Sequence, residues 1–138
     1  MWIYLLNKKK IMEKNKFKME NQCLTEEQSK DLFDIGVDVH GEFGIFETAS
    51  HDKFVAPVNL STTKDYTPIL TNAEMIGMLP ETIKCAWEND PMTLSVVYKN
   101  GSCVVKYDNQ TKGLEFSSPL LRDSLYSCIG FLKVNKLM

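Results

Sequence analysis

The Asn100-Gly101 dipeptide constrains the fold more strongly than any other feature of this sequence. It separates two runs rich in β-branched and aromatic residues, at 94–99 and 102–107. Because Asn-Gly adopts the positive φ angles of a two-residue type I′ turn, the sequence predicts a β-hairpin over residues 94–107. The two-residue loop fixes the register, which pairs Tyr98 with Cys103, Val96 with Val105, and Leu94 with Tyr107. One face of the hairpin is therefore apolar and needs a cover.

The last helix of the chain is predicted to supply that cover. Ser118 is expected to cap this helix, Pro119 to be its first residue, and its end to lie near residue 132. The apolar residues recur at spacings of four, three and four, namely Leu121, Leu125, Cys128 and Leu132. These spacings place them on one face of a helix, which we expect to pack on the hairpin.

A capping box indicates a shorter helix near the start of the chain. Thr25 and Gln28 have the spacing that begins a helix, here over residues 26–35. Gly36 is typical of the left-handed residue that ends one. The last turn carries three apolar residues that we expect on one side of the helix: Leu32, Phe33 and Ile35.

A second capping box, formed by Thr71 and Glu74, predicts another short helix. Its apolar residues are Met75, Ile76 and Met78. Proline is incompatible with the interior of a helix, so Pro80 is expected to break this one near Leu79. Residues 80–84 are then predicted to begin a second short helical turn.

Short β-type clusters complete the pattern, at 43–46, 53–56 and 114–116. The length and composition suit one globular domain that needs neither disulfides nor metal to fold. The sequence therefore predicts a single α+β domain over residues 19–138. We expect a small antiparallel sheet that includes the 94–107 hairpin and packs against the C-terminal helix and one or two short helices.

The first 18 residues differ in charge from the rest. They hold six lysines and one glutamate, a net charge of +5, so the remainder carries −7 of the total of −2. We interpret residues 1–18 as a flexible basic tail, and Met12 and Met19 are alternative start sites that would exclude part or all of it from the natural protein. Because the body is acidic, we expect no nucleic-acid partner.

Localisation is expected to be cytoplasmic. The apolar stretch at 2–6 precedes the lysines, which is the reverse of a secretory signal, and no apolar run is long enough for a membrane span. The four cysteines, at 23, 85, 103 and 128, have no C-x-x-C spacing typical of zinc sites. They are expected to be buried thiols in a reducing compartment.

The sequence contains no recognisable catalytic, cofactor-binding or metal-ligating motif, so we predict no such residues. The G-x-S-x-G, Walker and dinucleotide patterns are missing. His40 and Glu42 have the H-x-E spacing of zinc deaminases, but the required P-C-x-x-C segment is missing. An enzyme would need a site assembled in three dimensions around His40 or His51 with a cysteine or a carboxylate.

Trp87 is the candidate partner contact. It is followed by the polar stretch Glu88-Asn89-Asp90-Pro91. A tryptophan beside a polar loop can be exposed and serve in recognition, although burial in the core is the alternative.

One further indication comes from the order of the motifs between residues 19 and 132. They are Leu24-Thr25-Glu26-Glu27-Gln28, Gly36-Val37-Asp38, Thr71-Asn72-Ala73-Glu74, Leu79-Pro80, the hairpin and Asp123-Ser124-Leu125-Tyr126. This order resembles that of small uncharacterised proteins encoded by phages, prophages and other mobile elements of gut bacteria. The resemblance implies no activity, ligand or cofactor.

Two hypotheses for the function follow. The favoured one is a non-catalytic protein-interaction module, such as a phage or mobile-element accessory protein, that binds a protein partner through its acidic surface or associates with itself. The alternative is the small enzyme with a site around His40 or His51. A deep pocket holding either histidine would favour the enzyme, and a self-complementary apolar face would favour the module.

Overall fold

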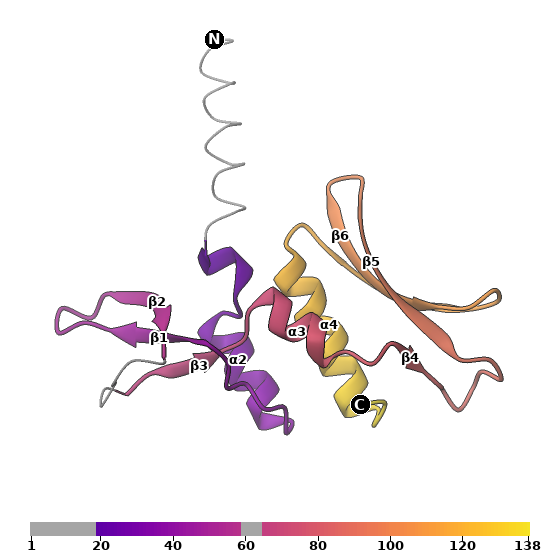
Figure 1. Cartoon of the computed structure of the whole chain (residues 1–138), viewed down its shortest axis with the longest axis horizontal. Coiled ribbons are helices and arrows are strands. Elements are labelled where there is room, and N and C mark those ends of the chain that lie inside the picture. The colour runs from indigo at the N-terminus through magenta and orange to yellow at the C-terminus, as the bar shows by residue number, and fades with distance from the viewer. Residues whose placement is uncertain (1–18, 59–64) are drawn as a thin grey trace, which may run out of the picture.

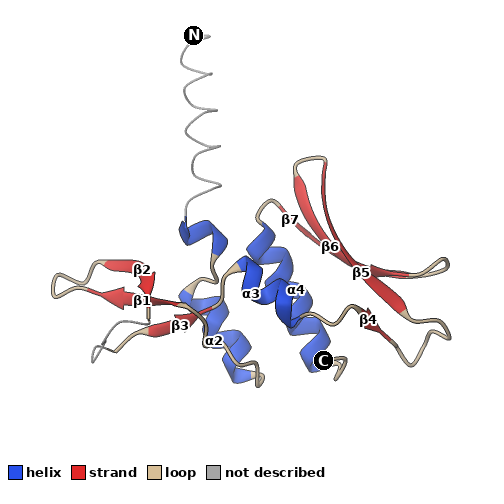
Figure 2. Ribbon diagram, in the orientation of Figure 1, coloured by secondary structure: helices blue, strands red, loops and turns tan. Residues whose placement is uncertain are grey.

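The fold is α+β, as the sequence predicts (Figures 1 and 2). The computed structural model describes residues 19–58 and 65–138, so the predicted basic tail, 1–18, lies outside the described residues. The helices are a short 3₁₀ helix (Met19–Gln22), α2 (Glu26–Asp34), α3 (Asn72–Met78) and α4 (Leu121–Val134). The strands are β1 (Phe43–Glu47), β2 (Lys53–Pro57), β3 (Thr67–Ile69), β4 (Thr82–Ile83), β5 (Met92–Lys99), β6 (Ser102–Asp108) and β7 (Gly113–Ser118).

Among the described residues the strands form two antiparallel sheets, with the orders β2-β1-β3 and β4-β5-β6-β7. The predicted hairpin is β5 and β6, and its register is confirmed: Tyr98 lies opposite Cys103, Val96 opposite Val105, and Leu94 opposite Tyr107. Asn100 and Gly101 have φ angles of 53° and 78°, which are the positive values that a type I′ turn requires. The local turn chemistry thus sets the register of the larger sheet.

Helix α4 covers the larger sheet, as expected from its apolar stripe. Leu125, Cys128 and Leu132 are fully buried, and so are Val105 and Tyr107 on β6. α4 also contacts α2 and α3, so it lies between the larger sheet and the shorter helices (Figure 1). Most of the buried apolar residues form one cluster that includes residues from both sheets and from the three α-helices.

The predicted start of the last helix is wrong by two residues. Ser118 is the last residue of β7 and pairs with Cys103, so it is part of the ladder and does not cap the helix. Leu120 stands at the cap position of α4 and makes no side-chain capping hydrogen bond. The helix is instead tied to the sheet by the buried Ser124, whose hydroxyl donates a 2.6 Å hydrogen bond to the carbonyl oxygen of Cys103.

Both predicted capping boxes are confirmed. Thr25 and Thr71 each accept a hydrogen bond from the backbone N–H three residues on, at 3.1 Å in both cases. Gly36, just beyond α2, has a φ of 95°. The prediction for the last turn of α2 is wrong in part, because Leu32 is buried while Phe33 is 61% exposed. Successive residues of a helix differ by about 100° in direction, so these two side chains cannot share a face.

The helical turn predicted at residues 80–84 is not formed. Thr82 and Ile83 make strand β4, in which Ile83 pairs with Met92 of β5. The side chains of Ile83 and Met92 are buried, at 4% and 1% exposure. The ladder with β5 and the burial of Ile83 outweigh the local preference of proline for a helix start.

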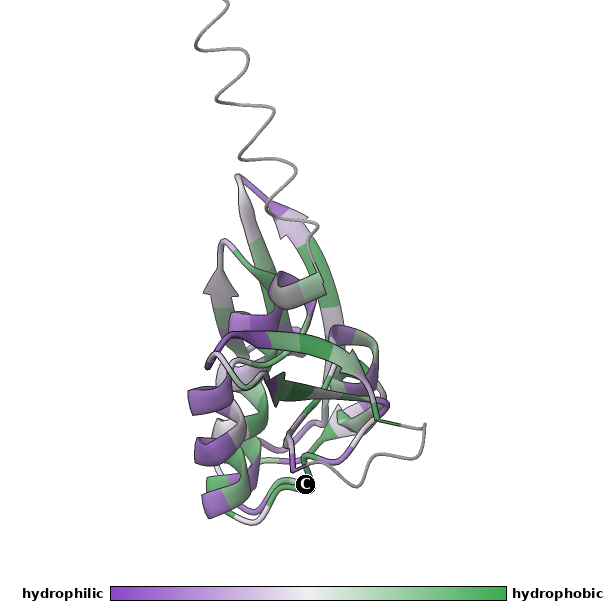
Figure 3. Ribbon diagram, turned by 90° about the vertical axis from the view of Figure 1, so that its left-hand side faces the viewer, coloured by the Kyte–Doolittle hydropathy of each residue, from purple (hydrophilic) through white to green (hydrophobic). Residues whose placement is uncertain are grey.

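The smaller sheet contains the two strands predicted in the first half of the chain. β1 and β2 pair from Phe43 with Pro57 to Glu47 with Lys53, and His51 in the connecting turn has a φ of 68°. β3 was not predicted, because Pro68 interrupts a short polar segment, yet it pairs with β1. Figure 3, in which this side of the molecule faces the viewer, shows hydrophobic residues along the strands.

Candidate interaction surface

The outer edge of β5 is covered by another strand over only part of its length. Strand β4 has two residues, and its ladder pairs Thr82 with Thr93. The backbone N–H of Leu94 then donates a 2.9 Å hydrogen bond to the carbonyl oxygen of Glu81. Beyond this bond, no strand in the described part of the chain pairs with residues 95–99 on that side (Figure 2).

The direction of the Leu94 amide shows which backbone groups this open edge presents. In an antiparallel ladder, successive residues turn their N–H and C=O groups alternately to one side and the other. The backbone N–H of Leu94 points away from β6, towards Glu81. The N–H and C=O groups of Val96 and Tyr98 therefore point away from β6 as well. The open edge therefore presents four backbone groups, two donors and two acceptors, to a strand from outside.

The side chains along this edge are apolar and exposed. Val96, Val97 and Tyr98 are 39%, 40% and 68% exposed. The predicted apolar face of the hairpin is therefore covered by α4 near Val105 and Tyr107 but left open towards the hairpin tip. Exposed β-branched and aromatic side chains on an unpaired edge are typical of strands that pair with another chain.

Trp87, the predicted partner contact, lies in the loop between β4 and β5 and is 51% exposed. Its neighbours in sequence on both sides are anchored in the core, because Cys85 and Met92 are each 1% exposed. The exposure of the indole agrees with what its polar sequence neighbourhood suggests. Its role as a contact stays a prediction.

Hydrogen bonds hold the Trp87 loop in place. The backbone N–H of Glu88 donates to the carbonyl oxygen of Cys85 at 3.1 Å. The side-chain amide of Asn109 donates to the carbonyl oxygen of Asp90 at 3.1 Å, and the hydroxyl of Thr111 donates to the carboxylate of Glu88 at 3.4 Å. The turn between β6 and β7 thus braces the loop, so that the tryptophan is presented on a fixed support.

The two histidines are each paired with a carboxylate at the surface. His40 Nδ1 lies 3.0 Å from Asp38 Oδ1, and His51 Nδ1 lies 3.1 Å from Glu47 Oε1. The side chains of the histidines are 62% and 86% exposed. The structure thus places each histidine beside a carboxylate, one of the two kinds of partner that the enzyme hypothesis allows, whereas no described hydrogen bond joins either histidine to a cysteine.

The cysteines, all of which lie in the described residues, are thiols rather than disulfides. Three are buried, as expected, and Cys103 is half-buried on β6. Burial raises the pKa of Cys128 to about 12 and also raises the pKa of Cys85, to which the nearby charge of Glu88 adds. Thiols with raised pKa values hold their protons at neutral pH and are poor nucleophiles.

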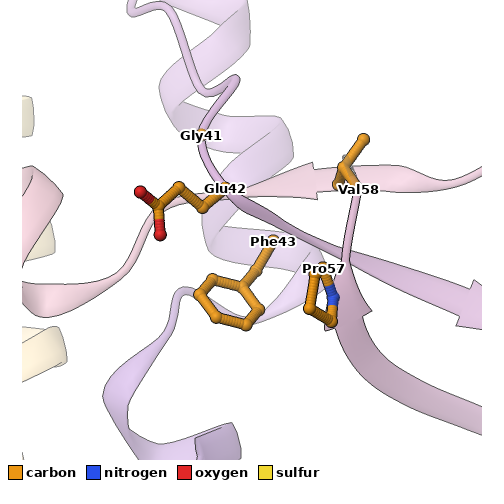
Figure 4. A pocket seen from close by; sticks show the side chains of 5 residues that line it. All are labelled: Gly41, Glu42, Phe43, Pro57 and Val58. Atoms are coloured by element: carbon orange, nitrogen blue, oxygen red, sulfur yellow. The ribbon is translucent and has the colours of Figure 1, made fainter. Parts of the chain in front are cut away.

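A hollow of about 490 Å³ lies where β1 begins and β2 ends (Figure 4). The described residues that line it are Gly41, Glu42, Phe43, Pro57 and Val58. The backbone N–H of Glu42 donates a 3.0 Å hydrogen bond to the carboxylate of Glu74. Glu42 is the only titratable side chain in the described lining, and neither histidine belongs to it.

A second hollow, of about 380 Å³, lies between α2 and α4. Its rim includes Ile35 and Val134, which are 38% and 66% exposed. The hydroxyl of Tyr126 donates a 2.8 Å hydrogen bond to Asp31 across it, and this bond raises the pKa of the tyrosine. Gly130 also lines it, and an added β-carbon there would meet no atom within 4 Å.

Residues 19–58 and 65–138 contain neither a cluster of metal ligands nor a membrane-spanning helix. No group of three or more histidine, cysteine, aspartate or glutamate side chains is placed to hold a metal ion. No helix within these ranges has the length and apolar character needed to cross a membrane.

The chain matches no protein-family model, and no curated protein or solved structure is significantly similar to it.

The sequence indicates Trp87 as a candidate contact but does not indicate the open edge of β5. The sequence shows that residues 94–99 are mostly apolar, but it does not show that β4, the strand beside them, has only two residues. The only local signal was Pro80, which lies between the end of α3 at Met78 and the start of β4 at Thr82.

Proposed function

We propose that this chain is a non-catalytic protein-interaction module and that Trp87 is a central contact for its protein partner. The observation that carries the proposal is the half-exposed indole of Trp87 on a braced loop. Exposed tryptophan is costly in water, and tryptophan is among the residues that contribute most to binding energy in protein interfaces.

The bracing of the loop supports a role in binding. A flexible loop would lose conformational entropy when a partner orders it, whereas a loop already held by hydrogen bonds loses little. Asn109 and Thr111 supply these bonds from the neighbouring turn, and Cys85 and Met92 fix the two ends. The support is therefore organised before the partner arrives.

The charge near Trp87 indicates the chemistry of the partner. Glu88 and Asp90 lie within three residues after the tryptophan, and residues 19–138 carry a net charge of −7. A partner with an apolar pocket surrounded by lysine or arginine would match this surface. A cytoplasmic accessory protein of a phage or mobile element is the setting that the order of motifs suggests.

Affinity capture from a lysate of the encoding cell tests the proposal, with the full chain and its Trp87→Ala variant as baits. Phe33→Ala is the matched control, because Phe33 is also an exposed aromatic residue, at 61%. The expected result is a stoichiometric basic partner that the wild type and Phe33→Ala retain and Trp87→Ala loses. A partner retained equally by all three baits, or no partner at all, would contradict the proposal.

A further inference from the structure

The open half of β5 carries fewer of the features that protect the other sheet edges. β2 begins with Lys53 and ends with Pro57, β3 has Pro68 at its centre, and β7 has the exposed Glu115 near its middle. Lysine, proline and charged residues at an edge discourage pairing with another strand. Residues 95–98 contain no such residue, and their first charged neighbour is Lys99 at the tip.

We infer that the open half of β5 pairs with the same segment of a second copy of this chain, antiparallel and across a two-fold axis, to join two four-stranded sheets into one. This goes beyond the proposed function, because it concerns self-association and does not depend on Trp87.

The short strand β4 fixes the register. It occupies the edge beside Met92 and Thr93, and Glu81 occupies the edge beside Leu94. A strand from outside can therefore lie only beside residues 95–99. Two copies of a five-residue segment that pair antiparallel across a two-fold axis are centred on its middle residue, which is Val97.

In this register the backbone groups match. Val96 of each copy lies opposite Tyr98 of the other, and these are the residues whose N–H and C=O groups face outward. The two pairs form four hydrogen bonds. The apolar side chains of Val96 and Tyr98 also come to lie side by side, on the face of the sheet that α4 covers further along.

The other face of the sheet matches as well. Val97 lies opposite Val97 of the second copy at the axis, where α-carbons are about 4.5 Å apart because this pair is not hydrogen-bonded. Ser95 lies opposite Lys99 of the second copy. The Ser95 hydroxyl is buried without a hydrogen-bond partner among the described residues, and the lysine ammonium brings a donor to that side. No like charges oppose each other in this register, and the exposed apolar residues Val96, Val97 and Tyr98 of one copy lie against the same residues of the other. The edge is therefore complementary to itself, which favours a second copy as the occupant.

The interface is small, which sets the expected affinity. Five residue pairs in total bury less area than the roughly 1,200–2,000 Å² of a standard stable interface. We therefore expect a dimer with a dissociation constant in the micromolar range. It closes on itself, because antiparallel pairing across a two-fold axis uses the open edge of both copies.

Sedimentation velocity of the full chain across micromolar concentrations tests the inference. The wild type is expected to shift from monomer to dimer. Val97→Lys places two ammonium groups at the axis and is expected to raise the dissociation constant roughly tenfold or more, an effect that added salt reduces. Val134→Lys is the matched control, because Val134 is an exposed valine on α4, at 66%. It is expected to leave the dimer unchanged.

Tyr98→Pro gives an independent test. It removes an outward-facing N–H from each copy, while the ladder with β6 keeps its bonds because the Tyr98 amide does not face β6. Loss of the dimer with a retained circular dichroism spectrum is expected. Amide exchange in the wild type checks the edge directly: exchange at Val96 and Tyr98 should slow as concentration rises, while Val97, whose amide faces β6, stays protected throughout.

Three outcomes would overturn the inference. They are a wild type that stays monomeric over the whole range, a dimer that survives both Val97→Lys and Tyr98→Pro, and a dimer in which exchange at Val96 and Tyr98 does not change. A monomer would leave the edge to an extended segment of another protein. Trp87→Ala is expected to dimerise normally, so this result is separable from that of the partner capture.

Discussion

The buried hydroxyl of Tyr107 donates a 2.7 Å hydrogen bond to the carbonyl oxygen of Pro80. Tyr107 stands in the middle of the larger sheet and is fully buried, and this burial raises the pKa of its hydroxyl. The bond fixes the chain where it leaves α3 and enters β4. It thereby helps to define how far β4 extends along β5 and where the open edge begins.

Replacing Tyr107 with phenylalanine tests that relationship. The variant leaves the carbonyl of Pro80 without its donor, so the free energy of unfolding should fall by about 1–3 kcal/mol. Urea denaturation measures the change. Tyr98→Phe is the control, because Tyr98 is 68% exposed, and it should change stability by less than about 0.5 kcal/mol. Equal effects of the two substitutions would show that the buried bond contributes nothing.

Gly130 offers a stabilising substitution. It lies inside α4, and a β-carbon there would meet no atom within 4 Å. Because glycine loses more backbone entropy in a helix than alanine, Gly130→Ala should raise the free energy of unfolding by about 0.5–1 kcal/mol. Gly36→Ala should lower it, because Gly36 has a φ of 95°. A thermal melt that shows Gly130→Ala below the wild type would contradict this description of α4.

Glu26 should make stability depend on pH. A hydrogen bond from Lys53, at 2.7 Å, holds the pKa of Glu26 below its ordinary value, and Lys30 adds a smaller effect. A carboxylate whose pKa is lowered by folding stabilises the protein above its unfolded pKa, and this contribution is lost as the pH falls through the folded value. Glu26→Gln should therefore lower the urea midpoint at neutral pH, and the difference should shrink in acid.

The control for this prediction is Glu27→Gln, because Glu27 shares the first turn of α2 and hence the same helix N-terminus. Salt weakens the surface ion pairs of Glu26 with Lys53 and with Lys30, so the comparison is best made at low ionic strength. If Glu27→Gln lowers the midpoint as much as Glu26→Gln does, the bond to Lys53 is not the cause.

The thiols should react in a fixed order. Cys103 is the only cysteine of the four that is not fully buried, and burial raises the pKa values of Cys85 and Cys128. Alkylation of the folded protein should therefore modify Cys103 first, and the others should react only after urea is added. Peptide mass spectrometry identifies the modified residue. Early modification of Cys128 would mean that α4 separates from the sheet far more readily than its packing indicates.

The elements that the sequence predicted well are those set by local chemistry. Asn100 and Gly101 fix a turn and, through it, the register of a whole hairpin. Thr25 and Thr71 start helices through hydrogen bonds that span only three residues. The polar residues beside Trp87 left exposure and burial as two alternatives, and the structure shows the indole 51% exposed.

The elements that the sequence did not predict depend on distant partners. Ile83 belongs to a strand because it is buried against β5, although the preceding proline favours a helix start. Ser118 completes a ladder with Cys103 and so is not available as a cap. The open edge of β5 follows from the length of β4, and a strand does not encode the length of its neighbour.

The most direct test of the central claim is the fluorescence of Trp87. The full chain contains two tryptophans, so the Trp2→Phe variant makes Trp87 the sole emitter. In the free protein its emission should be that of an indole in water and should be quenched readily by acrylamide. Addition of the captured partner should shift the emission to shorter wavelength and protect it from quenching. An indole already shielded in the free protein, or one whose quenching does not change in the complex, would contradict the role proposed for Trp87.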